Sequence, residues 1–153
     1  MQPSEKLQQM DLALPEVAQP VGSYTPAVAS GHLIFTAGQL PSEQGRLVAA
    51  GKVPADVPLE LAQRAARTAV LNAIAAAARS AGGIDNINRV VRMNVFVNSS
   101  PGFVEQAKVA NAASELIGQI FDSAGLHTRC AIGAAELPLN APVEIDLIVE
   151  SRG

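Results

Sequence analysis

Aromatic residues are rare in this sequence: they make up 3% of its 153 residues, and tryptophan is absent. Proteins that hold single-stranded nucleic acid usually stack its bases on aromatic side chains, and this chain offers few of them. Positive charge is also scarce, since 11 Lys and Arg residues against 14 Asp and Glu residues give a formal net charge of −3. The composition therefore argues against a nucleic-acid partner.

Cysteine and histidine are equally scarce. The single cysteine, Cys130, cannot form an internal disulfide and has no companion thiol for a metal, while His32 and His127 lie far apart in sequence. We therefore expect no metal site. The polar residues 1–11 contain no apolar signal region, and no apolar run is long enough to span a bilayer, so we expect a soluble cytoplasmic protein.

Several motifs of catalysis and cofactor binding are missing as well. The sequence contains no phosphate-binding loop, no dinucleotide fingerprint and no Gly-x-Ser-x-Gly motif of a nucleophilic serine. Gly82-Gly83 is interpreted as the end of a helix, His127 as a loop histidine and Cys130 as a buried small residue. We expect no cofactor.

Two stretches show the alternation of a strand with one buried face. In the first, Val91, Met93, Val95 and Val97 alternate with Arg92, Asn94, Phe96 and Asn98. In the second, Val143, Ile145, Leu147 and Val149 alternate with Glu144, Asp146, Ile148 and Glu150. Before the second stretch, Arg129 precedes a run of small and apolar residues that predicts a further strand up to Ala135.

Two helices are predicted between these strands. The first spans residues 58–81, with Asp56 as its N-cap and an alanine-rich face at helical spacing. The second begins at Ser100-Pro101 and ends by Gly125. Phe103, Ala107, Ala110, Ser114, Ile117 and Phe121 mark the predicted inner face of this second helix.

The remaining segments complete one domain. Residues 1–20 form a polar lead with a short helix near residues 4–10, and the domain covers residues 21–153. Two short strands are expected at residues 27–30 and 33–37. The loop-rich segment between Pro41 and Pro58 can hold another short strand at residues 46–49.

The order strand–strand–helix–strand–helix–strand–strand predicts an α+β fold with both helices on one face of the sheet. The other face is then uncovered. An uncovered apolar face usually has a partner, and a second copy of the same chain is the simplest one.

Arg129 and Glu144 are the strongest candidates for chemistry. An arginine can bind a carboxylate through two parallel hydrogen bonds, and a glutamate can hold a water molecule and move a proton. Together they could bind a small carboxylic acid and deliver water to the carbon beside it. The alternative is a structural ion pair between neighbouring strands, and the residues alone do not decide between the two.

A set of short motifs in a fixed order resembles the reactive intermediate deaminase family (RidA, also called YjgF). The resemblance covers residues 20–150 and is specific as an ordered set. Its parts are Val21-Gly22-Ser23-Tyr24, Phe35 to Pro41, Asn72, Ala81-Gly82-Gly83, Val91 to Val97, Phe103, Asn111, Arg129, Leu137-Pro138 and Glu144.

This resemblance implies a chorismate-mutase-like fold with a mixed sheet, related to the ferredoxin-like fold, and a homotrimer with clefts between subunits. It implies that Arg129 binds the carboxylate of an enamine or imine acid such as 2-aminoacrylate or 2-iminopropanoate. Glu144 positions the attacking water, and the products are a 2-keto acid and ammonia. Tyr24, Ala37, Gly38, Asn111 and Cys130 occupy the substrate-binding positions.

The sequence also departs from the family pattern. Ala37 replaces a serine that many members carry before Gly38, and Cys130-Ala131 follows Arg129 where Ser-Cys is more usual. The range of substrates therefore stays open. Two alternatives also stay open: a trimer that binds small carboxylates without catalysis and, second to it, the endoribonuclease and translation-inhibitor activity with which family members have been labelled.

Overall fold

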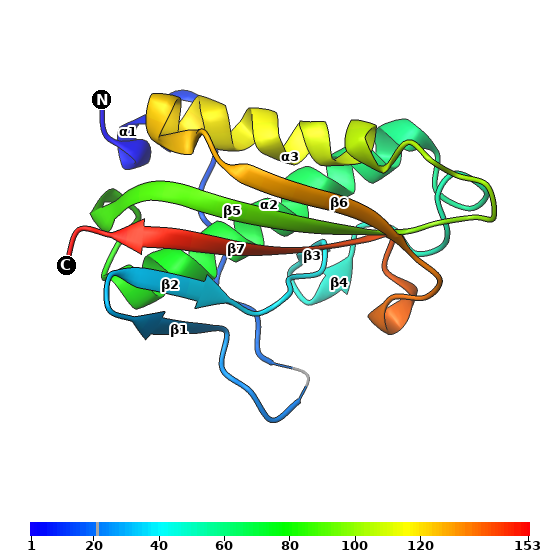
Figure 1. Ribbon diagram of the computed structural model, residues 1–153, viewed down its shortest axis with the longest axis horizontal. Helices are drawn as coiled ribbons and strands as arrows, with labels where there is room; N and C mark the ends of the chain where they lie inside the picture. The colour runs from blue at the N-terminus through cyan, green and yellow to red at the C-terminus, as the bar shows by residue number, and fades with distance from the viewer. Residues whose placement is uncertain (21) are drawn as a thin grey trace.

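A computed structural model describes residues 1–20 and 22–153, and in it two long helices lie against one face of a five-stranded sheet (Figure 1). The elements in chain order are α1 (Pro3–Gln9), β1 (Ala27–Ser30), β2 (Leu33–Thr36), β3 (Ser42–Glu43), β4 (Arg46–Leu47), α2 (Leu59–Ala81), the 3₁₀ helix η1 (Ile84–Asn86), β5 (Ile87–Asn98), α3 (Gln106–Phe121), η2 (Asp122–Gly125), β6 (Thr128–Ala134), η3 (Pro138–Asn140) and β7 (Val143–Ser151). Val21, which opens the predicted N-terminal motif, lies outside the described residues.

The five-stranded sheet has the order β1-β2-β7-β5-β6. Only the β5–β6 pair is parallel, because the chain crosses from β5 to β6 through α3, whereas the other three pairs are antiparallel. The predicted α+β fold with a mixed sheet is therefore confirmed. Strands β3 and β4 form a separate small hairpin in the loop-rich segment.

The core lies between the sheet and the helices α2 and α3. The side chains of Val143, Ile145, Leu147 and Val149 on β7 are buried in it, as the alternation predicts. Most of the buried residues of α2 are alanines, whose small side chains let the helix approach the sheet closely. Helix α2 ends at Gly82 in the left-handed conformation (φ 84°), as expected.

The predicted N-cap of the first long helix and the predicted start of the second are wrong. Helix α2 has Pro58 at its N-cap, and the carboxylate of Asp56 instead accepts a hydrogen bond from the backbone N–H of Lys52 at 2.9 Å. Helix α3 begins at Gln106, because Gly102 has φ 83° and the backbone N–H of Phe103 closes a turn on the Ser100 carbonyl.

Two predicted buried faces are correct except near their starts: Met93, Val95 and Val97 in β5, and Ala110, Ile117 and Phe121 in α3, are buried as predicted. In β5 a register irregularity between Val90 and Arg92 buries Val90 completely and leaves Val91 half-exposed. A bulge inserts one residue and reverses the alternation beyond it. In α3 the later start leaves Ala107 exposed in the first turn, and Val109 is the first buried residue.

The N-terminal segment packs on the domain through α1. Leu7 is buried in the core, and the hydroxyl of Ser4 donates a hydrogen bond to Asp85 at 2.6 Å. Lys6 forms an ion pair with Asp122 at 3.0 Å. Within residues 1–20 and 22–153, the helices are all too short or too polar to cross a membrane.

Candidate active site

Glu144 lies on the open face of the sheet, directly beside Gly38. Gln39 and Ile145 form a two-way backbone bridge, with N···O distances of 2.7 and 3.0 Å, which brings the chain after β2 alongside the start of β7. A Cβ atom placed on Gly38 would be only 2.1 Å from Oε2 of Glu144. Glycine is therefore needed at position 38 for the Glu144 side chain to occupy its place.

The environment of Glu144 favours its protonated form. Burial raises the pKa of the Glu144 carboxyl above its ordinary value, and the nearby charge of Asp146 raises it further. Burial also raises the pKa of Asp146, while a hydrogen bond from Asn94 at 2.9 Å and the charge of Arg92 act in the opposite direction. A carboxyl group whose pKa is raised is a stronger base when ionised, which suits it to accept a proton.

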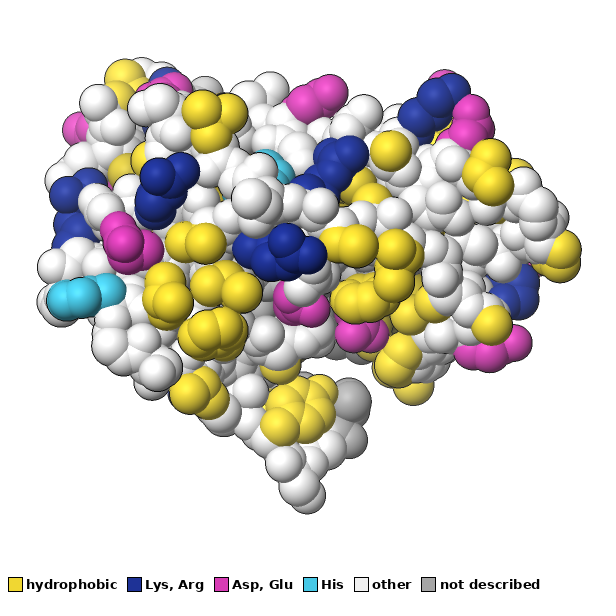
Figure 2. All heavy atoms as spheres, in the orientation of Figure 1, with side chains coloured by type: hydrophobic (Ala, Val, Ile, Leu, Met, Phe, Trp, Pro, Cys, Tyr) yellow, Lys and Arg dark blue, Asp and Glu magenta, His cyan; other side chains and the backbone are white. Residues whose placement is uncertain are grey.

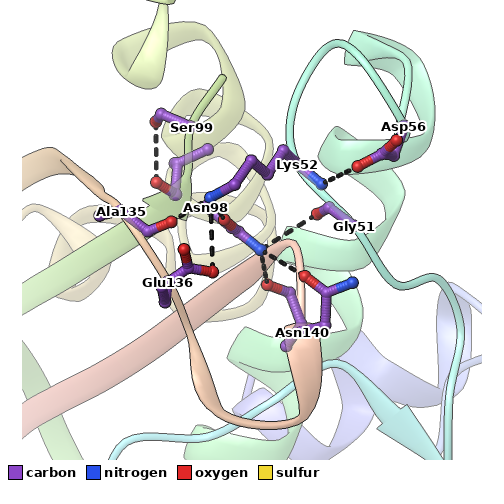
Figure 3. A network of polar contacts seen from close by, with 10 residues as sticks. Gly51, Lys52, Asp56, Asn98, Ser99, Ala135, Glu136 and Asn140 are labelled. Carbon is purple, nitrogen blue, oxygen red and sulfur yellow. Dashed lines mark hydrogen bonds and ion pairs between the residues drawn. The ribbon is translucent and has the colours of Figure 1, made fainter. Parts of the chain in front are cut away.

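Buried polar contacts fix the start of β7, just before Glu144 (Figure 3). Asn98 is completely buried at the end of β5. Its side-chain amide donates to the carbonyls of Gly51 and Ala141 at 3.3 and 3.1 Å and to Oδ1 of Asn140 at 3.1 Å. The ammonium group of Lys52 donates to Oδ1 of Asn98 at 3.0 Å and to the Ala135 carbonyl, and pairs with Glu136 at 3.6 Å.

Arg129 lies on the edge strand β6 and points toward α3. Its Nη1 atom donates to Oδ1 of Asn111 at 2.8 Å and to Oγ of Ser114 at 3.1 Å. Across the described chain, its Nε and Nη2 atoms have no hydrogen-bond partner. The Nε–Nη2 edge of the guanidinium is therefore free for a carboxylate, while the protein holds the opposite end.

Arg129 and Glu144 lie on opposite faces of the sheet. Arg129 is in register with the buried, helix-facing Met93, whereas Glu144 is in register with Phe96 on the open face. Strand β5 also separates β6 from β7. The alternative of an ion pair between neighbouring strands is therefore wrong, and one chain alone does not bring the two residues into one site.

The open face carries a patch of exposed apolar side chains. Figure 2 shows hydrophobic side chains gathered over the sheet on the side away from α2 and α3. Val28, Phe35 and Ile132 are 52%, 42% and 47% exposed, although they belong to strands. Apolar side chains exposed on strands are candidates for contact with a partner.

A hollow of about 1120 Å³ lies next to Gly38. Tyr24 and Gly38 line it, together with the N-terminal segment, the β3–β4 hairpin and the flank of α2. This hollow therefore reaches Gly38, which contacts Glu144, but Arg129 does not line it. Its walls include the apolar side chains of Leu12, Leu40, Leu47, Leu71 and Leu139.

The other predicted substrate-binding residues fall into separate places. Ala37 precedes Gly38 and donates its backbone N–H to the Pro26 carbonyl at 2.8 Å. Cys130 is half-buried and, as the residue after Arg129 in a strand, faces the open side. Among the described residues, no group of three or more His, Cys, Asp or Glu side chains is placed to hold a metal ion.

Residues 4–151 match the protein family described as "YjgF/chorismate_mutase-like, putative endoribonuclease". The chain belongs to the YjgF family. This confirms the resemblance and the chorismate-mutase-like fold expected from the sequence motifs.

Relatives within the YjgF family carry different names. The chain is 41% identical to "Protein TCP17" of Trypanosoma cruzi over 145 residues, which is 94% of this chain and 91% of that protein. It is 28% identical to "2-iminobutanoate/2-iminopropanoate deaminase" of Dermatophagoides farinae, covering 90% and 93% of the two chains. It is 29% identical to "Putative reactive intermediate deaminase TdcF" of Escherichia coli K12, covering 84% and 86%.

Solved YjgF-family structures share the fold. Atu1372 from Agrobacterium tumefaciens, described as having unknown function, superposes with a TM-score of 0.89 at 40% identity, covering 99% and 92% of the chains. A protein from Shewanella oneidensis described as a putative endoribonuclease gives 0.94 at 33% identity, covering 98% and 99%. Escherichia coli TdcF with bound serine gives 0.63 at 26% identity, covering 90% and 93%.

Proposed function

We propose that this protein is an enamine and imine deaminase that hydrolyses small 2-imino acids to 2-keto acids and ammonia. The observation that carries the proposal is the state of Arg129: its Nη1 atom is held by Asn111 and Ser114, and its Nε–Nη2 edge is open. That edge matches the two oxygens of a carboxylate. Two relatives named as deaminases support the assignment, and the name of one of them includes 2-iminopropanoate.

The reaction needs a second group that handles water, and Glu144 fills that role. An ionised Glu144 accepts a proton from water as the oxygen attacks the imine carbon and forms a C–O bond. The C=N π bond breaks in this step, and Glu144 passes the proton to the nitrogen, which gives a carbinolamine. The hydroxyl proton of the carbinolamine then moves to the amino group, the C–N bond breaks, and ammonia leaves as the C=O bond of the keto acid forms. The raised pKa of Glu144 makes its ionised form a stronger base toward the attacking water.

The two halves of the site meet between subunits. Arg129 lies at the outer edge of β6, and Glu144 lies on the open face, so the arginine of one subunit and the glutamate of a neighbour can face one cleft. The apolar patch of the open face supports packing against other copies of the chain. The family resemblance supports a homotrimer with three equivalent clefts.

The hollow beside Gly38 supplies room for the substrate side chain. Its volume of about 1120 Å³ exceeds what a three-carbon acid needs, and its leucine-rich walls favour apolar groups. We therefore expect imino acids with longer apolar side chains to be accepted as well as 2-iminopropanoate.

Imine hydrolysis is the direct test. An amino-acid oxidase generates the imino acid, and keto-acid release is followed with wild-type protein and with Arg129→Ala. Wild type should accelerate release, and Arg129→Ala should reduce the rate to background with its melting temperature unchanged. Equal rates for the two proteins would refute the proposal.

This assay also distinguishes a deaminase from a protein that binds small carboxylates without catalysis. A carboxylate-binding trimer would bind pyruvate saturably but leave the hydrolysis rate at background. RNA cleavage gains support only from the names of some relatives. The net charge of −3 gives the chain little affinity for phosphates, so we expect no measurable RNA binding at moderate salt.

A further inference from the structure

A chain of hydrogen bonds runs from Arg129 through Ser114 to His127 and ends on the backbone. The Nη1 atom of Arg129 donates to Oγ of Ser114 at 3.1 Å, and that oxygen lies 2.9 Å from Nε2 of His127. The other ring nitrogen, Nδ1, lies 2.6 Å from the carbonyl oxygen of Gly125. Ser114 is half-buried on α3, and His127 is half-buried in the loop before β6.

For a neutral imidazole, the chemistry of these atoms gives each hydrogen bond a direction. A carbonyl oxygen can only accept, so Nδ1 of His127 carries the hydrogen and donates it to Gly125. In neutral imidazole Nε2 is then an acceptor, and it takes the hydroxyl hydrogen of Ser114. With that hydrogen turned toward the ring, a lone pair of the hydroxyl oxygen is directed at Arg129.

We propose that Ser114 and His127 are positioning residues that orient the guanidinium of Arg129 for carboxylate binding, which rests on the function proposed above. An arginine side chain has several freely rotating bonds, and ordering it costs conformational entropy at each binding event. With Asn111 as its only partner, Nη1 would have one hydrogen held, and the guanidinium could still rotate about that hydrogen bond. The Ser114 oxygen holds the second hydrogen, and His127 keeps that oxygen in place.

The prediction concerns binding rather than the chemical step. Arg129 holds the carboxylate in the ground state and in the transition state alike, so loss of its orientation weakens both equally. Ser114→Ala should raise KM roughly tenfold with kcat within about twofold of wild type. Ser114→Thr restores a hydroxyl and should bring KM back toward wild type.

His127 should act only through Ser114. His127→Leu should raise KM to the same degree as Ser114→Ala, and His127→Gln, whose amide oxygen can accept the Ser114 hydrogen, should restore most of the binding. The double variant Ser114→Ala/His127→Leu should be no worse than Ser114→Ala alone, because both changes break one chain of contacts. Thr128→Ala is the matched control, since the Thr128 hydroxyl donates to the Val91 carbonyl at 3.2 Å instead.

The experiment measures imine hydrolysis and, separately, pyruvate binding by calorimetry, with melting temperatures to confirm folding. Weaker pyruvate binding and higher KM in Ser114→Ala and His127→Leu support the inference. If wild type binds pyruvate but hydrolyses no imine, and Ser114→Ala still weakens binding, the positioning role stands and the deaminase activity falls. If KM and pyruvate affinity are unchanged in these variants, or effects add in the double variant, the positioning role is refuted. Absence of both hydrolysis and pyruvate binding in wild type overturns both ideas.

Discussion

The contact between Gly38 and Glu144 gives a perturbation that separates catalysis from folding. A Cβ atom at position 38 would lie 2.1 Å from Oε2, 2.8 Å from Cδ and 3.1 Å from Cγ of Glu144. Non-bonded heavy atoms are comfortable at about 3.5 Å, so Gly38→Ala must displace the carboxylate by about 1 Å or more. The rest of the chain need not move, because the clash involves only the flexible end of one side chain.

Gly38→Ala is expected to lower the catalytic rate rather than the stability. Misplacing a catalytic group by about 1 Å can lower the rate by about 10²-fold, which corresponds to about 2.7 kcal/mol in the activation free energy. Stability should change little, because Gly38 is not among the glycines with a positive φ angle. An alanine there also reduces the freedom of the unfolded chain, which stabilises by about 0.4–1 kcal/mol.

The assay compares kcat for keto-acid release with the melting temperature of each variant. Gly118→Ala is the matched control: a Cβ there has no atom within 4 Å, so activity should be kept. In a Glu144→Gln background, Gly38→Ala should cause no further loss. If Gly38→Ala retains wild-type kcat, Glu144 does not position the water; if it unfolds the protein, Gly38 serves packing instead.

Four further predictions concern pH, stability and specificity. Asp146→Asn removes a charge that raises the pKa of Glu144, so the acidic limb of the kcat/KM profile should move to lower pH; an unmoved limb would exclude Glu144 as the base. Folding raises the pKa of Glu144, so the stability of the protein should fall as pH rises and the buried carboxyl group ionises. Glu144→Gln should therefore raise the melting temperature at pH 8 but not at pH 4. An equal effect at both pH values would contradict the conclusion that burial raises this pKa. Asn98→Ala leaves several buried partners unsatisfied and should cost about 2–4 kcal/mol in the free energy of unfolding by denaturant titration, whereas a loss below about 1 kcal/mol would show that water replaces the amide. Thr68→Trp narrows the hollow and should raise KM for imino acids with long side chains but not for 2-iminopropanoate. Its control is Glu60→Trp, at an exposed position of the same helix. Equal effects of Thr68→Trp on both substrates would show that the substrate side chain does not bind in the hollow.

The sequence predicts those parts of the fold where one local rule acts alone. The alternation in β7 identifies its buried face because every second residue from Val143 to Val149 is apolar. The start of α3 is wrong because Ser100-Pro101 satisfies the rules for a helix N-terminus, yet Gly102 takes a positive φ angle that continues a turn. The local sequence allows either a helix from Pro101 or a turn at Gly102, and it does not indicate which of the two the folded protein adopts.

The placement of Arg129 shows a second kind of limit. Its neighbours Cys130 to Ala134 are small or apolar on both faces, so alternation cannot show which face Arg129 occupies. Strand order cannot be read from periodicity either, and β5 lies between β6 and β7 because α3 returns the chain in parallel. The sequence places Ser114 on the inner face of a helix and His127 in a loop. It does not show that the two side chains meet, because they lie 13 residues apart.

The separation of Arg129 and Glu144 on opposite faces leads to a test by mixing two inactive variants. Arg129→Ala and Glu144→Gln are each expected to be inactive as pure assemblies. If each cleft takes its arginine from one subunit and its glutamate from the next, subunits mixed at random in equal amounts form an intact cleft with a probability of about one quarter.

The quarter arises because the arginine must come from a Glu144→Gln subunit and the glutamate from an Arg129→Ala subunit. Co-refolding the two variants should therefore restore about 25% of wild-type activity in a symmetric ring of any size. Mixing without refolding should restore activity only as fast as subunits exchange. If both residues acted within one chain, no mixture would recover activity, because every chain would lack one of the two groups.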